Sequence, residues 1–155
     1  MSERDQKLEA LGYPLDDVPG PGAIYRPVVI DGTTVYVSGA VPVANGVLTS
    51  KGKVPSEVSL DDAQQAAALC AANNLRMVRA AIGSLDRIER VLRITGYVNS
   101  DVDFTEPQLV INGASKLAIA VFGEDAGMGA RSAVGVAQLP RGASTEVEMI
   151  LKLKA

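Results

Sequence analysis

A long helix rich in small side chains is the sequence feature that most restricts the fold of this chain. Ser59 is a favourable N-cap residue, and Gly83 is a natural stop for a helix that reaches about Ile82. The middle of this segment, residues 66–72, consists mostly of alanine. Because small side chains let a helix lie close to its neighbours, we expect this helix to pack against a sheet.

The single cysteine, Cys70, lies inside the alanine-rich segment. A reactive thiol needs an electropositive and partly exposed setting, and such a segment gives no sign of one. We therefore interpret Cys70 as a packing residue. One cysteine also cannot form an internal disulfide, so the sequence does not indicate an oxidising compartment.

The residues before this helix predict paired strands. Residues 25–30 and 33–38 are rich in β-branched and aromatic side chains, and Asp31-Gly32 lies between them. This dipeptide is a preferred type I′ turn, because both central residues of that turn need positive φ. Residues 44–46 carry a second turn signal, and residues 51–57 are expected to form an exposed connection.

The residues after this helix predict a strand and a second helix. Residues 87–99 alternate between apolar and polar types, which is typical of a half-buried strand. The second helix is expected over residues 105–122, where Thr105 and Gln108 have capping-box spacing. The inward face predicted for the strand carries Ile88, Leu92, Ile94 and Val98, and its outward face carries Arg93, Thr95 and Tyr97.

Two further strands close the chain. A glycine-rich loop, residues 123–129, leads into strands predicted over residues 131–139 and 144–154, which we expect to be joined by a turn at residues 140–142. Residues 3–11 predict a short exposed helix. The main elements therefore follow the order β-β-α-β-α-β-β.

This order predicts one α+β domain over residues 1–155, with residues 1–22 as an N-terminal extension and loop. Both long helices are expected on one face of the sheet. The opposite face would then need cover, and oligomerisation is the simplest way to provide it.

The absence of histidine restricts the chemistry of this chain more than any other count. It removes Ser-His-Asp and Cys-His catalysis and the usual zinc sites. The net charge of −3 argues against a general nucleic-acid binder. The charged N-terminus lacks the apolar stretch of a signal peptide, and no apolar run approaches a membrane span, so we expect a cytoplasmic protein.

Arg131 heads a strand whose alternate positions carry small side chains. Period-two alternation puts Arg131, Ala133 and Gly135 on one face, which describes a shallow trough with a cation at its end. An arginine can hold a carboxylate through two parallel hydrogen bonds. The same residue could also be a surface arginine that simply begins a strand.

Glu146 and Glu148 lie on one face of the last strand, where a polar row is usually a solvated edge. Pairing across the turn at residues 140–142 would place Glu146 beside residues 136–137, well over 10 Å from Arg131 at about 3.3 Å per residue. A direct pair is therefore not expected. The two residues could share a site through substrate and water, or across a subunit boundary.

Three further positions are weak candidates on spacing alone. Tyr25 precedes the first strand, Ser38-Gly39 ends the second, and Asn112 lies within an apolar helix. Each of these residues is at least as often structural as functional in such a place.

Together these features resemble the RidA/YjgF family, the reactive-intermediate deaminases formerly described as endoribonucleases or translation inhibitors. The resemblance extends from about Tyr25 to the C-terminus. It is most specific at residues 130–140, with the sequence ARSAVGVAQLP, followed by Glu146-Val147-Glu148. Ser38-Gly39 and Asn112 also stand where that family places them.

The resemblance implies a chorismate-mutase-like α+β fold with a mixed sheet, and a homotrimer with sites in the clefts between subunits. In deaminase members, the arginine that matches Arg131 binds the substrate carboxylate, and the glutamate that matches Glu146 helps to position water. The positions implied to line the pocket are Tyr25, Ser38, Gly39, Asn112 and Ala133.

The activity implied is hydrolysis of a 2-imino acid or its enamine tautomer, such as 2-aminoacrylate, to a 2-keto acid and ammonia. No metal or cofactor is implied. An imine carbon is already electrophilic, so orientation, a placed water and modest acid–base help are sufficient, and histidine is not required.

The sequence departs from the family pattern at Ala40, Ala133 and Gly129, where polar or shaping residues are frequent. These departures point to a different substrate range or to low activity. A non-catalytic trimer that binds small carboxylate metabolites is the alternative function. An endoribonuclease is the third alternative, and both the acidic balance and the lack of histidine argue against it.

Overall fold

Five strands form a mixed sheet in the order β1-β2-β7-β5-β6, and β5 and β6 are its only parallel neighbours. The computed structural model describes all 155 residues of the chain. A separate two-stranded hairpin consists of β3 and β4. The strand bounds are β1 Val28–Asp31, β2 Thr34–Ala40, β3 Val43–Ala44, β4 Val47–Leu48, β5 Ile88–Asn99, β6 Ala130–Val136 and β7 Thr145–Leu153.

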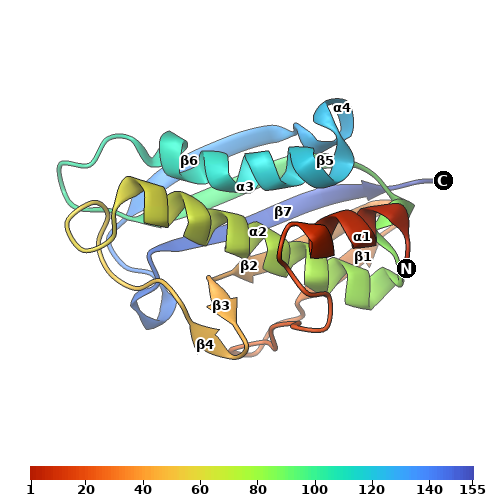
Figure 1. The fold of residues 1–155 in the computed structure, drawn as a ribbon, viewed down its shortest axis with the longest axis horizontal. Helices are drawn as coiled ribbons and strands as arrows, with labels where there is room; N and C mark the ends of the chain where they lie inside the picture. Colours follow the sequence, from red (N-terminus) through yellow and green to blue (C-terminus); the bar gives the residue numbers. More distant parts are fainter.

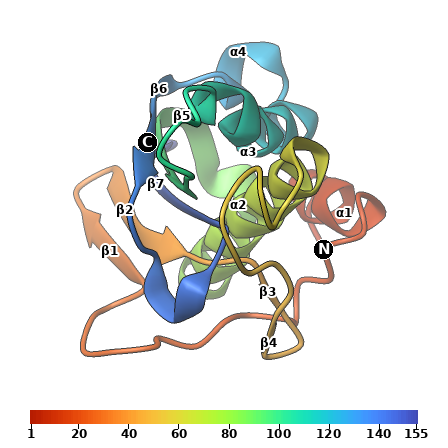
Figure 2. The ribbon, with the colours of Figure 1, turned by 90° about the vertical axis from the view of Figure 1, so that its left-hand side faces the viewer.

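Two long helices, α2 (Leu60–Ile82) and α3 (Pro107–Phe122), lie side by side on one face of this sheet (Figures 1 and 2). The opposite face carries no helix, as the side view in Figure 2 shows. We call it the open face. None of the helices combines the length and the apolar character that crossing a membrane requires.

The ends of α2 lie where the sequence predicted them. The Ser59 hydroxyl accepts a hydrogen bond from the Asp62 backbone, and Gly83 ends the helix with φ of 86°. Its alanine-rich face packs on the sheet with Cys70 fully buried, and burial raises the pKa of the Cys70 thiol to about 12. The interpretation of Cys70 as a packing residue is thus confirmed.

The predicted hairpin of β1 and β2 forms, but its turn lies one residue later than expected. Asp31 pairs with Thr34, so Gly32 and Thr33 are the central residues, and of these only Gly32 has positive φ, at 59°. The predicted type I′ turn at Asp31-Gly32 is therefore wrong, because that turn needs positive φ at both central residues. At the second predicted turn, Asn45 and Gly46 both have positive φ between β3 and β4. The connection at residues 51–57 is not exposed throughout, because Val54 is fully buried in the core.

The pairing predicted for the last two strands is wrong. β5 lies between β6 and β7, and residues 140–142 form a 3-10 turn, η2, within a longer crossing rather than a hairpin. Parallel strands need a crossover connection, and α3 supplies it between β5 and β6. β7 buries every second side chain, so a central place in the sheet suits it better than a place beside the edge.

Two local predictions also fail. The register of β5 shifts between Val91 and Arg93, so Val91 enters the core while Leu92 is 36% exposed. A bulge of this kind moves side chains to the other face, which simple alternation cannot anticipate. At the start of α3 the N-cap is Glu106, without a side-chain capping bond, so the predicted capping box at Thr105 does not form.

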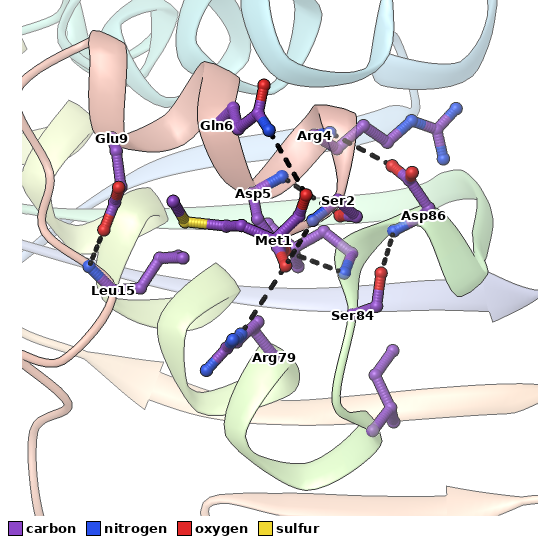
Figure 3. Close-up of polar contacts among 12 residues, drawn as sticks. Met1, Ser2, Arg4, Asp5, Gln6, Glu9, Leu15, Arg79, Ser84 and Asp86 are labelled. Atoms are coloured by element: carbon purple, nitrogen blue, oxygen red, sulfur yellow. Dashed lines mark hydrogen bonds and ion pairs between the residues drawn. The ribbon is translucent and has the colours of Figure 1, made fainter.

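The predicted N-terminal helix, α1 (Glu3–Ala10), forms but is docked rather than simply exposed. Leu8 is fully buried, and the buried Asp5 carboxylate accepts a hydrogen bond from the Leu85 backbone. Asp86 accepts hydrogen bonds from the backbone N–H groups of Glu3 and Arg4 at the start of the helix (Figure 3). Leu85 and Asp86 belong to the 3-10 turn η1 (Leu85–Arg87), and the glycine-rich loop contains a short helix, α4 (Glu124–Gly127).

Candidate functional site

Arg131 points toward the helices. In the parallel register of β5 and β6 it stands beside Ile94, which lies in the core under α3. Its Nη1 donates to Asn112 Oδ1 at 2.8 Å and to Ser115 Oγ at 3.1 Å, and its Nη2 donates to the Gln108 carbonyl at 3.0 Å. A guanidinium has five N–H donors, so three bonds to α3 leave two donors for a ligand.

One stripe of α3 supplies all three acceptors. Gln108, Asn112 and Ser115 are spaced by four and then three residues, which puts them on the same side of a helix. Sequence reasoning found Asn112 but missed Ser115 and the Gln108 carbonyl. The signal was present, because Gln108, Asn112 and Ser115 form a polar stripe on a helix whose other residues, apart from Lys116, are apolar or small.

The row of small residues after Arg131 is not the open trough that alternation suggested. Ala133 packs against the core beneath the helices. Farther along β6, a side chain at Gly135 would come within 2.8 Å of the Ser100 hydroxyl. The cation therefore stands at a packed edge of the sheet, held by α3.

Glu146 lies on the other side of the sheet. Burial in β7 alternates strictly, with Thr145, Val147 and Met149 in the core, so Glu146 and Glu148 project from the open face. In β2 a bulge places Ser38 and Gly39 opposite the single residue Glu148. A Cβ at position 39 would stand 2.9 Å from Glu146 Oε1, so glycine is what lets this carboxylate lie across β2.

The carboxyl group of Glu146 has a raised pKa, first because it is partly buried and second because Glu148 stands nearby. It makes no hydrogen bond to another residue of the chain. Glu148, in contrast, accepts a hydrogen bond of 3.0 Å from the Tyr97 hydroxyl. Burial and this contact also raise the pKa of Tyr97. Glu146 is thus the carboxyl group here that is free to exchange a proton with a ligand or water.

A cavity of about 660 Å³ opens beside Glu146. Four of the predicted site residues line it, namely Tyr25, Ser38, Gly39 and Glu146. Glu148, which the sequence placed on the same face as Glu146, lines it as well. Sequence reasoning missed several other lining residues, which come from loops, from β3, from α2 and from the η2 turn. They include Asp17, Val18, Val43, Met77 and Arg141.

The outer wall of this cavity is an irregular segment, residues 14–25, which we call the strap. Figure 2 shows the chain after α1 passing the β3–β4 hairpin and turning to β1 at the edge of the sheet. The Tyr25 hydroxyl accepts a hydrogen bond from the Gly22 backbone, which folds the end of the strap over itself. The Ser38 hydroxyl donates to the Arg26 carbonyl at 2.7 Å, so the strap ends against β2.

Buried polar residues of α2 hold the strap in place. The Arg76 side chain is 2% exposed, and its Nε donates to the Pro14 carbonyl at 2.7 Å. Its Nη1 lies 3.4 Å from the Asp17 carboxylate, which also accepts hydrogen bonds from the Asn45 backbone. The strap is therefore tied both to α2 and to the β3–β4 hairpin.

The inner wall is tied to the same helix. Asn73 Nδ2 donates to the carbonyls of Val41 and Val43, and Asn74 Nδ2 donates to the Ser38 carbonyl. Arg76 also donates to Asn73 Oδ1 at 2.8 Å, which joins the two sets of ties. Nothing in the residue pattern of this alanine-rich helix identified Asn73, Asn74 and Arg76 as a framework for a cavity.

The predicted site residues thus form two groups on opposite faces of one sheet. Arg131, Asn112 and Ala133 belong to the helix side, whereas Glu146 projects from the open face with Gly39 beside it. The expectation that Arg131 and Glu146 form no direct pair holds, but the reason is their opposite faces and not their distance along a hairpin. No three Cys, Asp or Glu side chains are grouped to hold a metal ion.

The fold defines a class of protein: an α+β domain of the chorismate-mutase-like type, with two helices on one face of a mixed sheet. The family model described as "YjgF/chorismate mutase-like, putative endoribonuclease" matches residues 5–149. The chain therefore belongs to the YjgF/RidA family, as its sequence features indicated.

Three relatives illustrate this relationship. Protein TCP17 of Trypanosoma cruzi is 40% identical over 148 residues, covering 94% of this chain and 91% of that protein. The crystal structure of Atu1372 from Agrobacterium tumefaciens, a protein of unknown function, is 42% identical with a TM-score of 0.90 and covers 97% of this chain and 92% of that one. Escherichia coli TdcF, solved with bound serine, is 25% identical with a TM-score of 0.62 and covers 90% and 94%.

Proposed function

We propose that this chain hydrolyses 2-imino acids to 2-keto acids and ammonia, at a site that two copies of the chain complete. Water adds to the imine carbon, the C–N bond breaks, and nitrogen leaves as ammonia while the carbon becomes a ketone. The enamine tautomer, for example 2-aminoacrylate, enters by proton transfer to its terminal carbon. Arg131 binds the substrate carboxylate in this scheme, and Glu146 handles the protons.

The geometry of Arg131 is the observation that carries this proposal. Three bonds to α3 fix the plane of its guanidinium and leave two N–H groups, which is the number that a carboxylate accepts in a paired arrangement. Because the side chain is already held, little conformational entropy is lost on binding. Family membership and the bound serine of TdcF, which is itself a carboxylate, support the same role.

Glu146 has the properties that a proton carrier in this reaction needs. Its raised pKa brings it closer to neutral pH, where a group both accepts and returns protons efficiently. As a carboxylate it takes a proton from the attacking water, and as a carboxylic acid it gives a proton to the leaving nitrogen. The cavity beside it has room for both water and substrate.

The opposite faces of Arg131 and Glu146 support a site between copies. One substrate molecule cannot contact side chains on both faces of a sheet within one chain. The open face also carries exposed Tyr36, Val29 and Val134, which a second copy would cover. A closed homotrimer would satisfy both requirements by bringing Arg131 of one copy to Glu146 of the next.

The direct test is to generate 2-aminoacrylate enzymatically from serine and to measure 2-keto acid release. We expect the wild-type protein to accelerate release over the spontaneous rate, and both Arg131→Ala and Glu146→Gln to abolish the acceleration. If the folded protein binds 2-keto acids in calorimetry but does not accelerate hydrolysis, the chain is a carboxylate-binding protein and the proposed activity is wrong.

A second experiment tests the position of the site. Arg131→Ala and Glu146→Gln chains, co-expressed in equal amounts and purified together, should recover about a quarter of the wild-type activity, since half of the arginine donors and half of the glutamate donors remain functional. Co-expressed Glu146→Gln and Glu146→Ala chains are the matched control and should recover none. Equal failure of both mixtures would place the site within one copy.

A further inference from the structure

Two glutamates project from the open face two residues apart in β7, and one hydroxyl donor stands beside them. Glu146 and Glu148 are separated by about 6.6 Å along the strand. In the register of β5 and β7, Tyr97 lies directly opposite Glu146. Its hydroxyl nevertheless donates to Glu148 Oε1 at 3.0 Å, and Glu146 receives no hydrogen bond from the chain. The two carboxyl groups are therefore close to each other but differ in their partners.

The hydrogen bond from Tyr97 makes the two carboxyl groups chemically unequal. A hydroxyl donor favours the charged form of the carboxylate that accepts it, and here that carboxylate is Glu148. The charge on Glu148 then disfavours a second charge beside it, which adds to the effect of burial in raising the pKa of Glu146. The pKa of Tyr97 is also raised, so its hydroxyl keeps its proton and remains a donor. A proton shared by the pair is therefore expected on Glu146.

The other titratable groups around the pair do not replace this effect. Cys70, on the helix side of β7, carries no charge, since burial raises its pKa to about 12. Asp17 is paired with Arg76, and no cation of the chain forms an ion pair with Glu146 or Glu148. The remaining groups are Tyr36 on β2, Arg93 on β5, Tyr25 at the end of the strap and Arg141 in η2. None of them donates a hydrogen bond to either glutamate, so the tyrosine on β5 is the donor that distinguishes the two.

We propose that Tyr97 and Glu148 are positioning residues for the proposed reaction: the tyrosine hydroxyl fixes Glu148 as a lasting carboxylate, and this charge keeps the exchangeable proton on Glu146. The inference rests on the proposed function and adds two residues to it, neither of which contacts the reacting atoms. As the C–O bond forms, the proton of the attacking water passes to Glu146. As the C–N bond breaks, the same proton passes to the leaving nitrogen. Tyr97 and Glu148 neither gain nor lose a proton in this cycle.

The first experiment measures the titration of Glu146 directly and needs no substrate. The side-chain carboxyl carbons of isotope-labelled glutamate are followed by NMR as pH changes, and comparison with Glu146→Gln assigns the signal. We expect the midpoint for Glu146 to move to lower pH by at least about half a unit in Glu148→Gln, because the neighbouring charge is lost. In Tyr97→Phe the midpoint should also fall, by a smaller amount, because Glu148 begins to share the proton.

Tyr36→Phe is the matched control for this titration. Tyr36 is also a tyrosine of the open face, is 47% exposed, and makes no hydrogen bond through its hydroxyl. Its replacement should leave the midpoint of Glu146 unchanged. A midpoint that is the same in wild type, Glu148→Gln and Tyr97→Phe overturns the proposal, whether or not the protein hydrolyses imines.

Kinetics connect the position of the proton to the reaction. With 2-aminoacrylate generated from serine, Tyr97→Phe should lower kcat about three- to tenfold and change KM less than about twofold, because carboxylate binding at Arg131 is untouched. Glu148→Gln should move the part of the pH profile of kcat/KM that depends on Glu146 to lower pH. Tyr36→Phe should change neither quantity.

The outcomes separate this inference from the proposed function. If the wild-type protein accelerates hydrolysis but Tyr97→Phe and Glu148→Gln leave kcat and the pH profile as they are, the positioning role is wrong and the proposed function stands. If the wild-type protein accelerates nothing, the proposed function and the role of these two residues in it are overturned together.

Discussion

The surroundings of Arg131 and those of Glu146 differ in almost every physical respect. Arg131 extends from a strand to a helix, and three hydrogen bonds fix its side chain. The Glu146 carboxyl group has no hydrogen-bond partner in the chain, its pKa is raised, and irregular segments form the wall of the cavity beside it. A cation held by several hydrogen bonds suits a part of the substrate that stays fixed, whereas loops suit parts that vary. In the proposed reaction, binding of the carboxylate and transfer of protons would therefore be separate tasks, carried out from opposite faces of the sheet.

The largest effect is expected from Arg131 itself. Arg131→Ala should lower kcat/KM by about 100- to 1000-fold, since two charge-assisted hydrogen bonds to the carboxylate are lost. Arg131→Lys should recover little of this, because an ammonium group cannot make paired planar bonds. Steady-state kinetics with 2-aminoacrylate, generated enzymatically from serine, measures both losses.

The control for Arg131 is Arg90→Ala. Arg90 is also an arginine on the sheet, and its Nη2 donates to the Asp125 carbonyl, but it belongs to neither group of site residues. Its removal should change kcat/KM by less than about twofold. A loss as large as that of Arg131→Ala would mean that surface charge, and not a carboxylate clamp, governs the rate.

The next largest effect is on stability and concerns Arg76, which holds the wall of the cavity beside Glu146. Arg76→Met should lower the free energy of unfolding by about 2–4 kcal/mol, because it leaves Asp17 and buried acceptors without their partner. Arg131→Met should cost less than about 1 kcal/mol, since its partners are partly solvated. Urea unfolding of the two variants gives the comparison, and equal losses would show that the framework under the cavity is not the more critical of the two.

A smaller effect is expected at Asn112. Asn112→Ala removes one of three acceptors that orient the guanidinium, so kcat/KM should fall by about tenfold, with most of the change in KM. Ser115→Ala should behave similarly but less strongly, because the 3.1 Å bond to Ser115 is longer. An unchanged KM in both variants would show that the remaining bond to the Gln108 carbonyl is sufficient to hold Arg131.

The smallest effect concerns the pH dependence of stability. Because the folded state raises the pKa of Glu146 above its ordinary value of 4.5, the folded protein binds more protons than the unfolded chain just above that pH. The contribution of this group to stability therefore falls as pH rises through the raised pKa. Glu146→Gln should melt roughly 1–3 °C higher than wild type near pH 7.5 and at the same temperature near pH 4.

Exposed Glu106 provides the control for this measurement, since its side chain makes no capping bond. Glu106→Gln should leave the difference in melting temperature between the two pH values as it is in wild type. If Glu146→Gln is no more stable than wild type at neutral pH, the surroundings of Glu146 do not disfavour its charge.

Local signals in the sequence predicted the parts of the fold that local interactions determine. The caps at Ser59 and Gly83 act within a few residues and are confirmed. The hairpin near Gly32 also forms, although its turn lies one residue later than predicted. The position of β6 depends on contacts with β5 that are distant in sequence, so the pattern of β6 and β7 alone suggested a hairpin. The order of strands depends on contacts throughout the sheet. The residue patterns of two consecutive strands therefore do not determine whether those strands pair with each other.

The candidate site shows the same division. Family resemblance singled out Arg131 and Glu146 but not the faces from which they project, because that depends on sheet register and on the bulge at Ser38-Gly39. The burial of Arg76 and Asn73 could not be predicted from the sequence for another reason. A polar residue in a helix is usually solvent-exposed, and only the path of the strap shows that these two are not.

The strap also has an evolutionary consequence. Its outer residues, 20–25, are exposed and make few contacts with the core. Substitutions and insertions there should therefore change the free energy of unfolding only slightly. Arg131 and its helical partners are untouched by such changes, since they lie on the other side of the sheet. If Arg131 binds the carboxylate as proposed, related chains could change the wall of the cavity beside Glu146 and still keep the group that binds the carboxylate.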